Sequence, residues 1–285
     1  MTRVIVHAGY HKTGTTSLQD FLHRNREALA PHLRYYGKAD FLAAGAHARI
    51  YAQKPFFWRL WRFRRALRRF LNGVEPGGVI VLSRETFSGG MPGHRKIGGR
   101  LMTSYAEAAG PLARVIVSEL RRRFSKGVDI TFFYTTRDTE NWIRSVHGHL
   151  LRSIALAEDF DAFRAQFPKL KGPAEEAGAM ARLLSPIPVV TAALEDYKTH
   201  REGPAAALLD LLNIPADLRA TLKPAPRSNT GQSEDLRARF LRMNRTAPDK
   251  SALKAAKDAA ILAESHSGRV SGQGPAKTPN PRGRP

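Results

Sequence analysis

Short apolar runs alternate along the chain with longer segments whose apolar residues recur at helical spacing. Four runs are rich in β-branched or aromatic residues and are bounded by turn-forming or polar residues, as buried strands are. These predicted strands are Val4–Gly9, Val79–Ser83, Ile130–Thr135 and Ile187–Ala192. The first, third and fourth each lead into a predicted helix. This alternation of strands and helices predicts an α/β fold with a largely parallel sheet.

Two helices are outlined by their apolar spacing. From Thr16 onward, one helical face carries Leu18, Phe21, Leu22, Asn25 and Leu29. Pro31 stands where such a helix would end, so we expect one helix between Thr16 and Leu29. A second helix is expected over Pro111–Phe124, directly before the third strand.

The composition predicts one folded domain followed by an unfolded end. With 285 residues and 42% hydrophobic content, the chain can build a core, and we expect a single α/β domain over residues 1–263. Residues 264–285 are basic and rich in glycine, proline and serine. We expect them to form a disordered tail, because such a segment buries too little apolar area to offset its ordering entropy.

Two absences from the sequence narrow the class of protein. The chain has no cysteine, which excludes disulfide scaffolds, cysteine-ligated metals and thiol nucleophiles. No run approaches the roughly 20 apolar residues of a membrane span. The run Val4–Val6 is also shorter than the roughly 7–15-residue core of a signal peptide. We therefore expect a cytoplasmic protein.

The chain carries a large excess of positive charge: 46 Lys and Arg residues against 25 Asp and Glu, a formal net charge of +21. Such a balance favours polyanionic partners. Part of the charge lies in Trp58–Phe70, where six arginines are interleaved with an apolar stripe. This pattern predicts a surface helix that buries its stripe. The alternative is a basic amphipathic helix that lies on an anionic membrane surface or on a nucleic acid.

A glycine- and threonine-rich segment follows the first predicted strand directly: Gly9-Tyr10-His11-Lys12-Thr13-Gly14-Thr15-Thr16-Ser17. A loop of this kind between a strand and a helix predicts an anion site, because backbone N–H groups and the helix N-terminus point at the ligand. Gly9 and Gly14 have the spacing of the ATP-binding pattern G-x-x-x-x-G-K-[ST]. However, Thr15 stands where that pattern needs lysine, and Lys12 lies earlier, so the loop argues against an ordinary nucleoside triphosphate.

The stretch Lys12–Ser17 after a strand resembles the 5′-phosphosulfate loop of the PAPS-dependent sulfotransferases (PAPS is 3′-phosphoadenosine-5′-phosphosulfate). The resemblance implies a three-layer P-loop-type fold, with a central, mainly parallel sheet flanked by helices. It also implies a catalytic role for Lys12, and 5′-phosphate binding by the N–H groups of Thr13–Thr16 and the hydroxyls of Thr15, Thr16 and Ser17. The donor site so implied comprises His11, Lys12, Thr13, Gly14, Thr15, Thr16 and Ser17.

A second element fits the same family. Arg137 follows the third predicted strand and Ser145 comes eight residues later, which is the spacing of the family's 3′-phosphate site. An arginine offers phosphate a rigid fork of donors, and a serine adds one hydrogen bond. The family usually has proline where this chain has Thr139. The alternative is that Arg137 merely pairs with a carboxylate, Asp138 or Glu140, at a helix start.

A third, weaker element lies near the C-terminal end. Arg227 and Asn229 stand where bacterial members of the family carry a loop that covers the nucleotide, and we count both as donor-binding candidates. The alternative is an ordinary polar loop.

An acceptor hydroxyl usually needs a general base. Glu85 is the first candidate, because it follows the second predicted strand and ligands bind beyond the carboxyl ends of parallel strands. His47 is the second candidate, from the region after the first helix where such proteins often build the acceptor pocket. The resemblance requires no metal, and we expect none.

The resemblance therefore implies sulfuryl transfer from PAPS to a hydroxyl or amine of a carbohydrate, lipid or small metabolite. One alternative is an atypical P-loop kinase or other nucleotide-binding protein that uses ATP and Mg²⁺. Another is a basic, non-enzymatic protein that binds anions or an anionic membrane. We expect a nucleotide donor and a small-molecule or glycan acceptor as partners, no specific nucleic acid, and weak contact with an anionic membrane surface.

Overall fold

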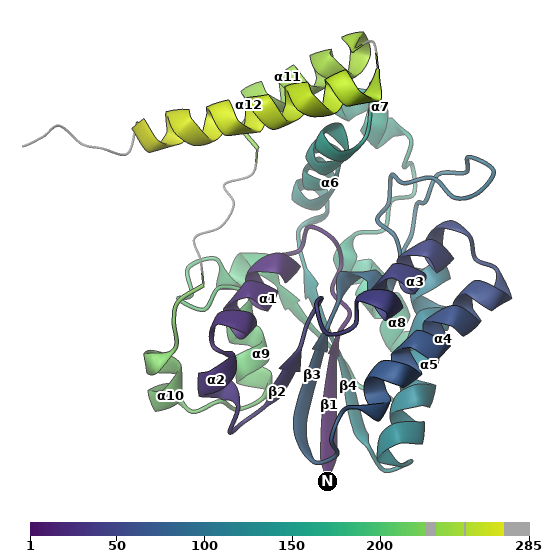
Figure 1. The fold of residues 1–285 in the computed structure, drawn as a ribbon, viewed down its shortest axis with the longest axis vertical. Coiled ribbons are helices and arrows are strands. Elements are labelled where there is room, and N and C mark those ends of the chain that lie inside the picture. The colour runs from purple at the N-terminus through teal and green to yellow at the C-terminus, as the bar shows by residue number, and fades with distance from the viewer. Residues whose placement is uncertain (226–231, 248, 271–285) are drawn as a thin grey trace, which may run out of the picture. The chain divides into compact units, whose positions relative to one another are not determined.

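A sheet of five parallel strands organises the larger part of the computed structural model, which describes residues 1–225, 232–247 and 249–270 (Figure 1). The strands lie in the order β2-β3-β1-β4-β5, and every neighbouring pair is parallel. Their bounds are β1 Thr2–His7, β2 Arg34–Tyr36, β3 Gly78–Ser83, β4 Asp129–Thr136 and β5 Val189–Ala193. The predicted α/β fold is confirmed. The short edge strand β2 is the one that the sequence pattern does not mark.

Helices cover both faces of this sheet, which gives three layers (Figure 1). One layer contains α1 Thr15–Arg24, α2 Arg26–Leu29, α9 Ala205–Leu211 and α10 Ala216–Thr221. The other contains α3 Leu42–Gln53, α4 Phe57–Asn72, α5 Ala106–Phe124 and α8 Pro173–Leu184. Two short 3₁₀ turns follow strand ends, η1 Glu85–Ser88 after β3 and η2 Leu194–Tyr197 after β5. This arrangement is consistent with the three-layer P-loop-type fold that we expect.

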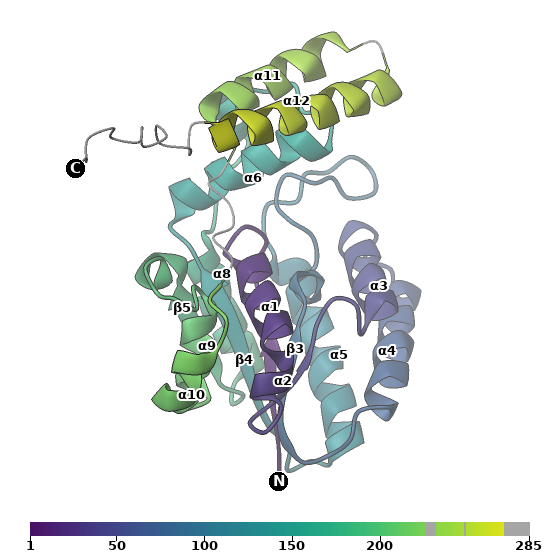
Figure 2. The same ribbon diagram turned by 60° about the vertical axis from the view of Figure 1, so that its left-hand side comes forward.

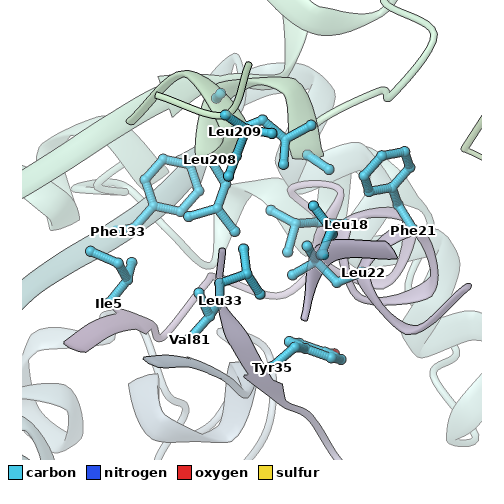
Figure 3. Packing of buried hydrophobic residues seen from close by; sticks show 14 of the residues in the cluster. Ile5, Leu18, Phe21, Leu22, Leu33, Tyr35, Val81, Phe133, Leu208 and Leu209 are labelled. Carbon is cyan, nitrogen blue, oxygen red and sulfur yellow. The ribbon is translucent and has the colours of Figure 1, made fainter. Parts of the chain in front are cut away.

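The core beneath α1 fixes the start of that helix against the sheet. Alternate residues of a strand point to opposite faces, and Ile5, Val81 and Phe133 of the three central strands point to the same one (Figure 3). They pack with residues of the covering helices α1 and α9, namely Leu18, Phe21, Leu22, Leu208 and Leu209. All eight side chains are fully buried. The loop between β1 and α1 is therefore anchored at both ends.

Two helix boundaries differ from the prediction. The single helix expected between Thr16 and Leu29 is divided into α1 and α2 at Asn25, whose side chain is buried. The amide group of Asn25 donates to the carbonyls of Phe21 and Lys223, both at 3.0 Å, and accepts from the Lys223 N–H at 2.7 Å. Helix α5 starts at Ala106, five residues before the expected start. The first boundary depends on the contacts of Asn25 with Lys223, and at the second the Ala106 N–H donates to the Glu176 carboxylate at 3.1 Å. Such tertiary contacts override local propensity.

The described residues form two compact units, residues 1–147 with 164–225 and residues 148–163 with 232–247 and 249–270. Helices α6 Thr139–Ser153 and α7 Phe160–Ala165 cross between them, and α11 Glu234–Thr246 and α12 Lys250–Val270 pack side by side in the smaller unit (Figure 2). The sequence predicts one domain over 1–263, with no boundary marked by composition. Of the tail expected over 264–285, α12 covers residues up to Val270, and 271–285 lie outside the described residues.

A buried carboxylate joins α4 to α5. The Glu119 side chain is 1% exposed and accepts two hydrogen bonds from Arg68, both at 2.8 Å, and one from Arg122 at 2.9 Å. These bonds, that of Arg68 first, hold the pKa of Glu119 below its usual value. A lowered pKa in the folded state stabilises the protein above the unfolded-state pKa of about 4.3, and this stability is lost as the pH falls through the folded-state pKa.

Glu119→Gln is therefore expected to destabilise the protein by about 1–2 kcal/mol at pH 7. This is less than the cost of breaking a fully buried ion pair, because the arginines are partly exposed to solvent. The difference from wild type should shrink as the pH falls below about 4. Urea denaturation at several pH values measures the destabilisation and its dependence on pH. Glu140→Gln is the control, because Glu140 is 59% exposed and pairs with Arg164 at 3.0 Å. Equal losses in the two variants would contradict the role of Glu119.

Candidate functional site

The glycine-rich segment after β1 forms a loop at the carboxyl edge of the sheet and enters α1 directly. Its backbone is left-handed at Lys12, with φ +70°, and at Gly14, with φ +88°. A Cβ atom on Gly9 would lie 2.7 Å from both His7 Nε2 and Thr15 Oγ1, so the loop has room only for glycine there. The strand–loop–helix arrangement predicted from the sequence is therefore present.

Internal hydrogen bonds hold this loop in shape. The Thr13 hydroxyl donates to the Tyr10 carbonyl at 2.8 Å and lies 2.9 Å from a threonine hydroxyl of β4. The Thr15 hydroxyl also donates to the Tyr10 carbonyl, at 3.1 Å. The Thr15 hydroxyl thus donates inside the loop in this structure, and its expected donation to a phosphate stays a prediction. The exposed Thr16 and the half-buried Ser17 remain as hydroxyls able to meet a ligand.

The N-terminus of α1 offers backbone donors. Among the residues that the structure describes, no side chain caps this helix, and its first turn contains no acidic residue. The N–H groups of Thr15, Thr16 and Ser17 have no acceptor within the helix. Together with the positive end of the helix dipole, they favour an anion at this point.

Two aromatic residues outside the loop form hydrogen bonds with its backbone. The His11 N–H donates to the Tyr105 hydroxyl at 3.2 Å, and the Trp142 indole N–H donates to the His11 carbonyl at 2.9 Å. Both aromatic side chains are buried. Neither residue is assigned a role by the sequence motifs. Trp142 lies inside the stretch from Arg137 to Ser145 and could have been considered there, whereas Tyr105 has no local signal.

Arg137 reaches the loop from the end of β4. Its guanidinium donates to the Lys12 carbonyl at 3.3 Å. Within the described part of the chain, Arg137 forms no ion pair: Glu140 pairs with Arg164, and the Asp138 carboxylate accepts from a backbone N–H at 2.9 Å. The alternative that Arg137 merely pairs with a neighbouring carboxylate is therefore wrong, and the guanidinium keeps donors for a ligand.

Ser145 lies on α6, half-buried. It is three residues after Trp142, and residues at this spacing share a helix face. Trp142 of the same helix donates to the His11 carbonyl of the loop. The expected role of Ser145 in binding a 3′-phosphate stays a prediction.

The surroundings of His11 are positive. Burial, first, and then the charges of His94, Lys12 and Arg84 lower the pKa of His11 to about 3. Its imidazole is therefore neutral at physiological pH, and the positive charge beside the loop comes from Lys12 and Arg84. Positive surroundings of this kind suit an anion.

Glu85 is brought to the same sheet edge as the loop. Strand β3 pairs with β1 so that Ser83 lies opposite His7, and the Arg84 N–H donates to the His7 carbonyl at 3.0 Å. Glu85 is the next residue, the first of η1, and is half-buried. A carboxylate beyond the end of β3 can therefore face a ligand held by the loop of β1.

Arg84 is a member of this edge that the sequence analysis does not single out. Its side chain is 7% exposed and donates to the Thr86 hydroxyl at 3.1 Å. No carboxylate of the described residues lies within ion-pair distance of it. Its position directly before Glu85 at a strand end is the signal that could have drawn attention to it.

His47 is not brought to the loop. Helix α3 presents Gly45 to Arg84, since a Cβ on Gly45 would collide with that guanidinium. His47 lies about 200° further round the helix and lines a depression of about 390 Å³ between α3 and α4. The rest of the lining is Ala43, Trp61, Arg62, Arg65, Ala66 and Arg69. Burial and the charges of two α4 arginines lower the pKa of His47. These surroundings do not support its role as general base.

The remaining donor-binding candidates, Arg227 and Asn229, lie outside the described residues. In the part of the chain that is described, no helix is both long and apolar enough to cross a bilayer. Comparison of the sequence with models of known protein families found no match, and comparison with curated proteins found none either.

Proposed function

We propose that this protein is a PAPS-dependent sulfotransferase, which transfers a sulfuryl group to a hydroxyl or amine of a carbohydrate, lipid or small-metabolite acceptor in the cytoplasm. The observation that carries the proposal is the contact between Arg137 and the Lys12 carbonyl. These residues belong to two motifs 125 positions apart, of which one resembles the family's 5′-phosphosulfate loop and the other its 3′-phosphate site.

The donor would be held by groups on two elements. The N–H groups at the start of α1, with the Thr16 and Ser17 hydroxyls, suit the 5′-phosphosulfate. Arg137 and Ser145 suit the 3′-phosphate, because a guanidinium binds phosphate oxygens with two parallel donors. This division fits the geometry, since Arg137 reaches the loop from the adjacent strand β4.

The reaction proposed is an in-line displacement at sulfur. The acceptor oxygen or nitrogen forms a bond to sulfur as the bond from sulfur to the bridging oxygen breaks, and 3′,5′-ADP leaves. The Lys12 ammonium would stabilise the negative charge that develops on the bridging oxygen. The Glu85 carboxylate would take the proton of the acceptor. Positioning and charge stabilisation then supply most of the rate enhancement.

The kinase alternative is disfavoured by Thr15. In the ATP-binding pattern this position holds a long lysine that reaches the β- and γ-phosphates. Here it holds a buried threonine whose hydroxyl donates to the Tyr10 carbonyl. A kinase would also have no use for Arg137 beside the loop, because ATP has no 3′-phosphate for it to bind.

Arg137→Ala tests the proposed 3′-phosphate site. We expect the affinity for 3′,5′-ADP to fall about 10- to 100-fold, the loss of one or two charge-assisted hydrogen bonds. The affinity for 5′-AMP, which lacks the 3′-phosphate, should change little. Isothermal titration calorimetry with the two nucleotides measures the difference.

The 5′-AMP titration separates ligand binding from loop distortion, because Arg137 also contacts the Lys12 carbonyl. Arg121→Ala is a matched control: this exposed arginine lies near the C-terminal end of α5. An equal loss of affinity for both nucleotides in Arg137→Ala, or no loss for either, would count against the assignment.

A further inference from the structure

Helix α4 has two faces of opposite character. Its inner face buries Phe63, Leu67 and Leu71 completely, which confirms the surface helix expected from the apolar stripe. The opposite side, which we call the α4 outer face, lies within a sector of about 100° at 3.6 residues per turn. It comprises Trp58, Trp61, Arg62, Arg65 and Arg69.

The aromatic residues of this helix are unusually open to water. Trp58 is 43% exposed and Trp61 is 55% exposed, and the neighbouring Phe57 is 81% exposed. Large aromatic side chains are normally buried, and their exposure together marks an interaction surface. Burial of the inner face is already complete, so the fold of the larger unit does not require these side chains.

The arginines of the α4 outer face carry charge that is not neutralised within the described chain. Arg64 and Arg68, on the flank of the helix, pair with Glu119. By contrast, no carboxylate of the described residues pairs with Arg62, Arg65 or Arg69. These three also line the 390 Å³ depression beside α3, with Trp61 next to them. The α4 outer face therefore combines exposed indole rings with a depression lined by arginines.

We propose that the α4 outer face docks the protein on an anionic membrane surface. Tryptophan is favoured at the boundary between headgroups and acyl chains, because its ring is apolar and its N–H is polar. Each arginine near an anionic bilayer adds electrostatic attraction to the lipid headgroups. The depression offers a place for a lipid phosphate among the arginines. This proposal does not depend on the proposed enzymatic function.

A nucleic acid fits this surface less well. Base stacking needs free ring faces. Trp58 already stacks on Phe56, with centroids 4.5 Å apart and an interplanar angle of 9°. The guanidinium of Arg65 lies over the Trp61 ring, 5.6 Å from its centroid. One face of each indole is thus occupied, whereas insertion of the ring edges between lipid headgroups needs no free face.

Tryptophan fluorescence on vesicles tests the proposal with the full chain. The chain has three tryptophans, and Trp142 is fully buried, so Trp58 and Trp61 report the α4 outer face. With vesicles of phosphatidylcholine containing 30 mol% phosphatidylglycerol, we expect a blue shift and quenching by brominated lipid. Pure phosphatidylcholine vesicles should give neither. A full signal on the neutral vesicles, or none on the anionic ones, would overturn the proposal.

A charge-reversal pair identifies the face. Arg62→Glu with Arg65→Glu should weaken sedimentation with the anionic vesicles at least about tenfold. The control is Arg114→Glu with Arg121→Glu, which removes the same charge from exposed positions of α5 and should have little effect. Equal weakening by both pairs would mean that net charge alone binds the lipid, and would overturn the role of α4. Tryptophan quenching by single-stranded DNA without any vesicle response would overturn it in favour of a nucleic acid.

Discussion

Replacing Lys12 with alanine is expected to slow sulfuryl transfer from PAPS by about 100- to 1,000-fold. Lys12 lies between the two loop glycines, beside the N-terminus of α1 and in contact with Arg137 through its carbonyl. Its ammonium is proposed to stabilise charge that exists on the bridging oxygen only as the transition state forms. The fall in kcat should therefore exceed the loss of affinity for 3′,5′-ADP. The release of 3′,5′-ADP from PAPS measures the rate.

Lys12 has φ +70°, and lysine and alanine are equally strained in this left-handed conformation. The substitution should therefore leave the backbone conformation of the loop unchanged. Lys126→Ala is the matched control, since Lys126 is exposed and precedes β4 at the opposite edge of the sheet. A Lys12→Ala protein that turns over PAPS as fast as the control would remove Lys12 from the reaction.

Glu85→Gln is expected to reduce kcat with a hydroxyl acceptor by about 100- to 10,000-fold. Glutamine keeps the size of the side chain but cannot accept the proton of the attacking hydroxyl. The affinity for 3′,5′-ADP should stay unchanged, because Glu85 is not assigned to the donor. Steady-state kinetics with an acceptor found by screening, together with calorimetry on the donor side, measures both quantities.

The control for this variant lies at the other end of the same strand. Glu75 is exposed and precedes β3, whereas Glu85 follows it. Glu75→Gln should retain the wild-type kcat. If Glu85→Gln also retains it, the general base is another residue and the proposed role of Glu85 is wrong.

The loop between β1 and α1 could be predicted from the sequence because the information that specifies it is local. A β-branched run, two glycines at fixed spacing and a helical pattern after them determine a strand, a loop and a helix within 24 residues. That Arg137 lies at the same edge of the sheet as the loop was also predictable, since both follow parallel strands, and the carboxyl ends of such strands meet at one edge. The strand order that makes β4 a neighbour of β1 is visible only in the structure.

The rest of the site depends on contacts that no local pattern carries. Tyr105 supports the loop from 94 residues away, and its own surroundings are not periodic. His47 was expected near the acceptor, but the rotation of α3 turns it towards the arginines of α4. The smaller unit begins inside the continuous pattern of α6, so no linker composition marks it.

The most direct test of the proposed function is calorimetric titration of the wild-type protein with 3′,5′-ADP in EDTA and, separately, with ATP and Mg²⁺. We expect 3′,5′-ADP to bind without metal and about tenfold or more tightly than ATP with Mg²⁺, a difference of about 1.4 kcal/mol. Binding of ATP with Mg²⁺ but not of 3′,5′-ADP would contradict the sulfotransferase proposal and favour a kinase. Binding of neither nucleotide would contradict a functional donor site in the loop.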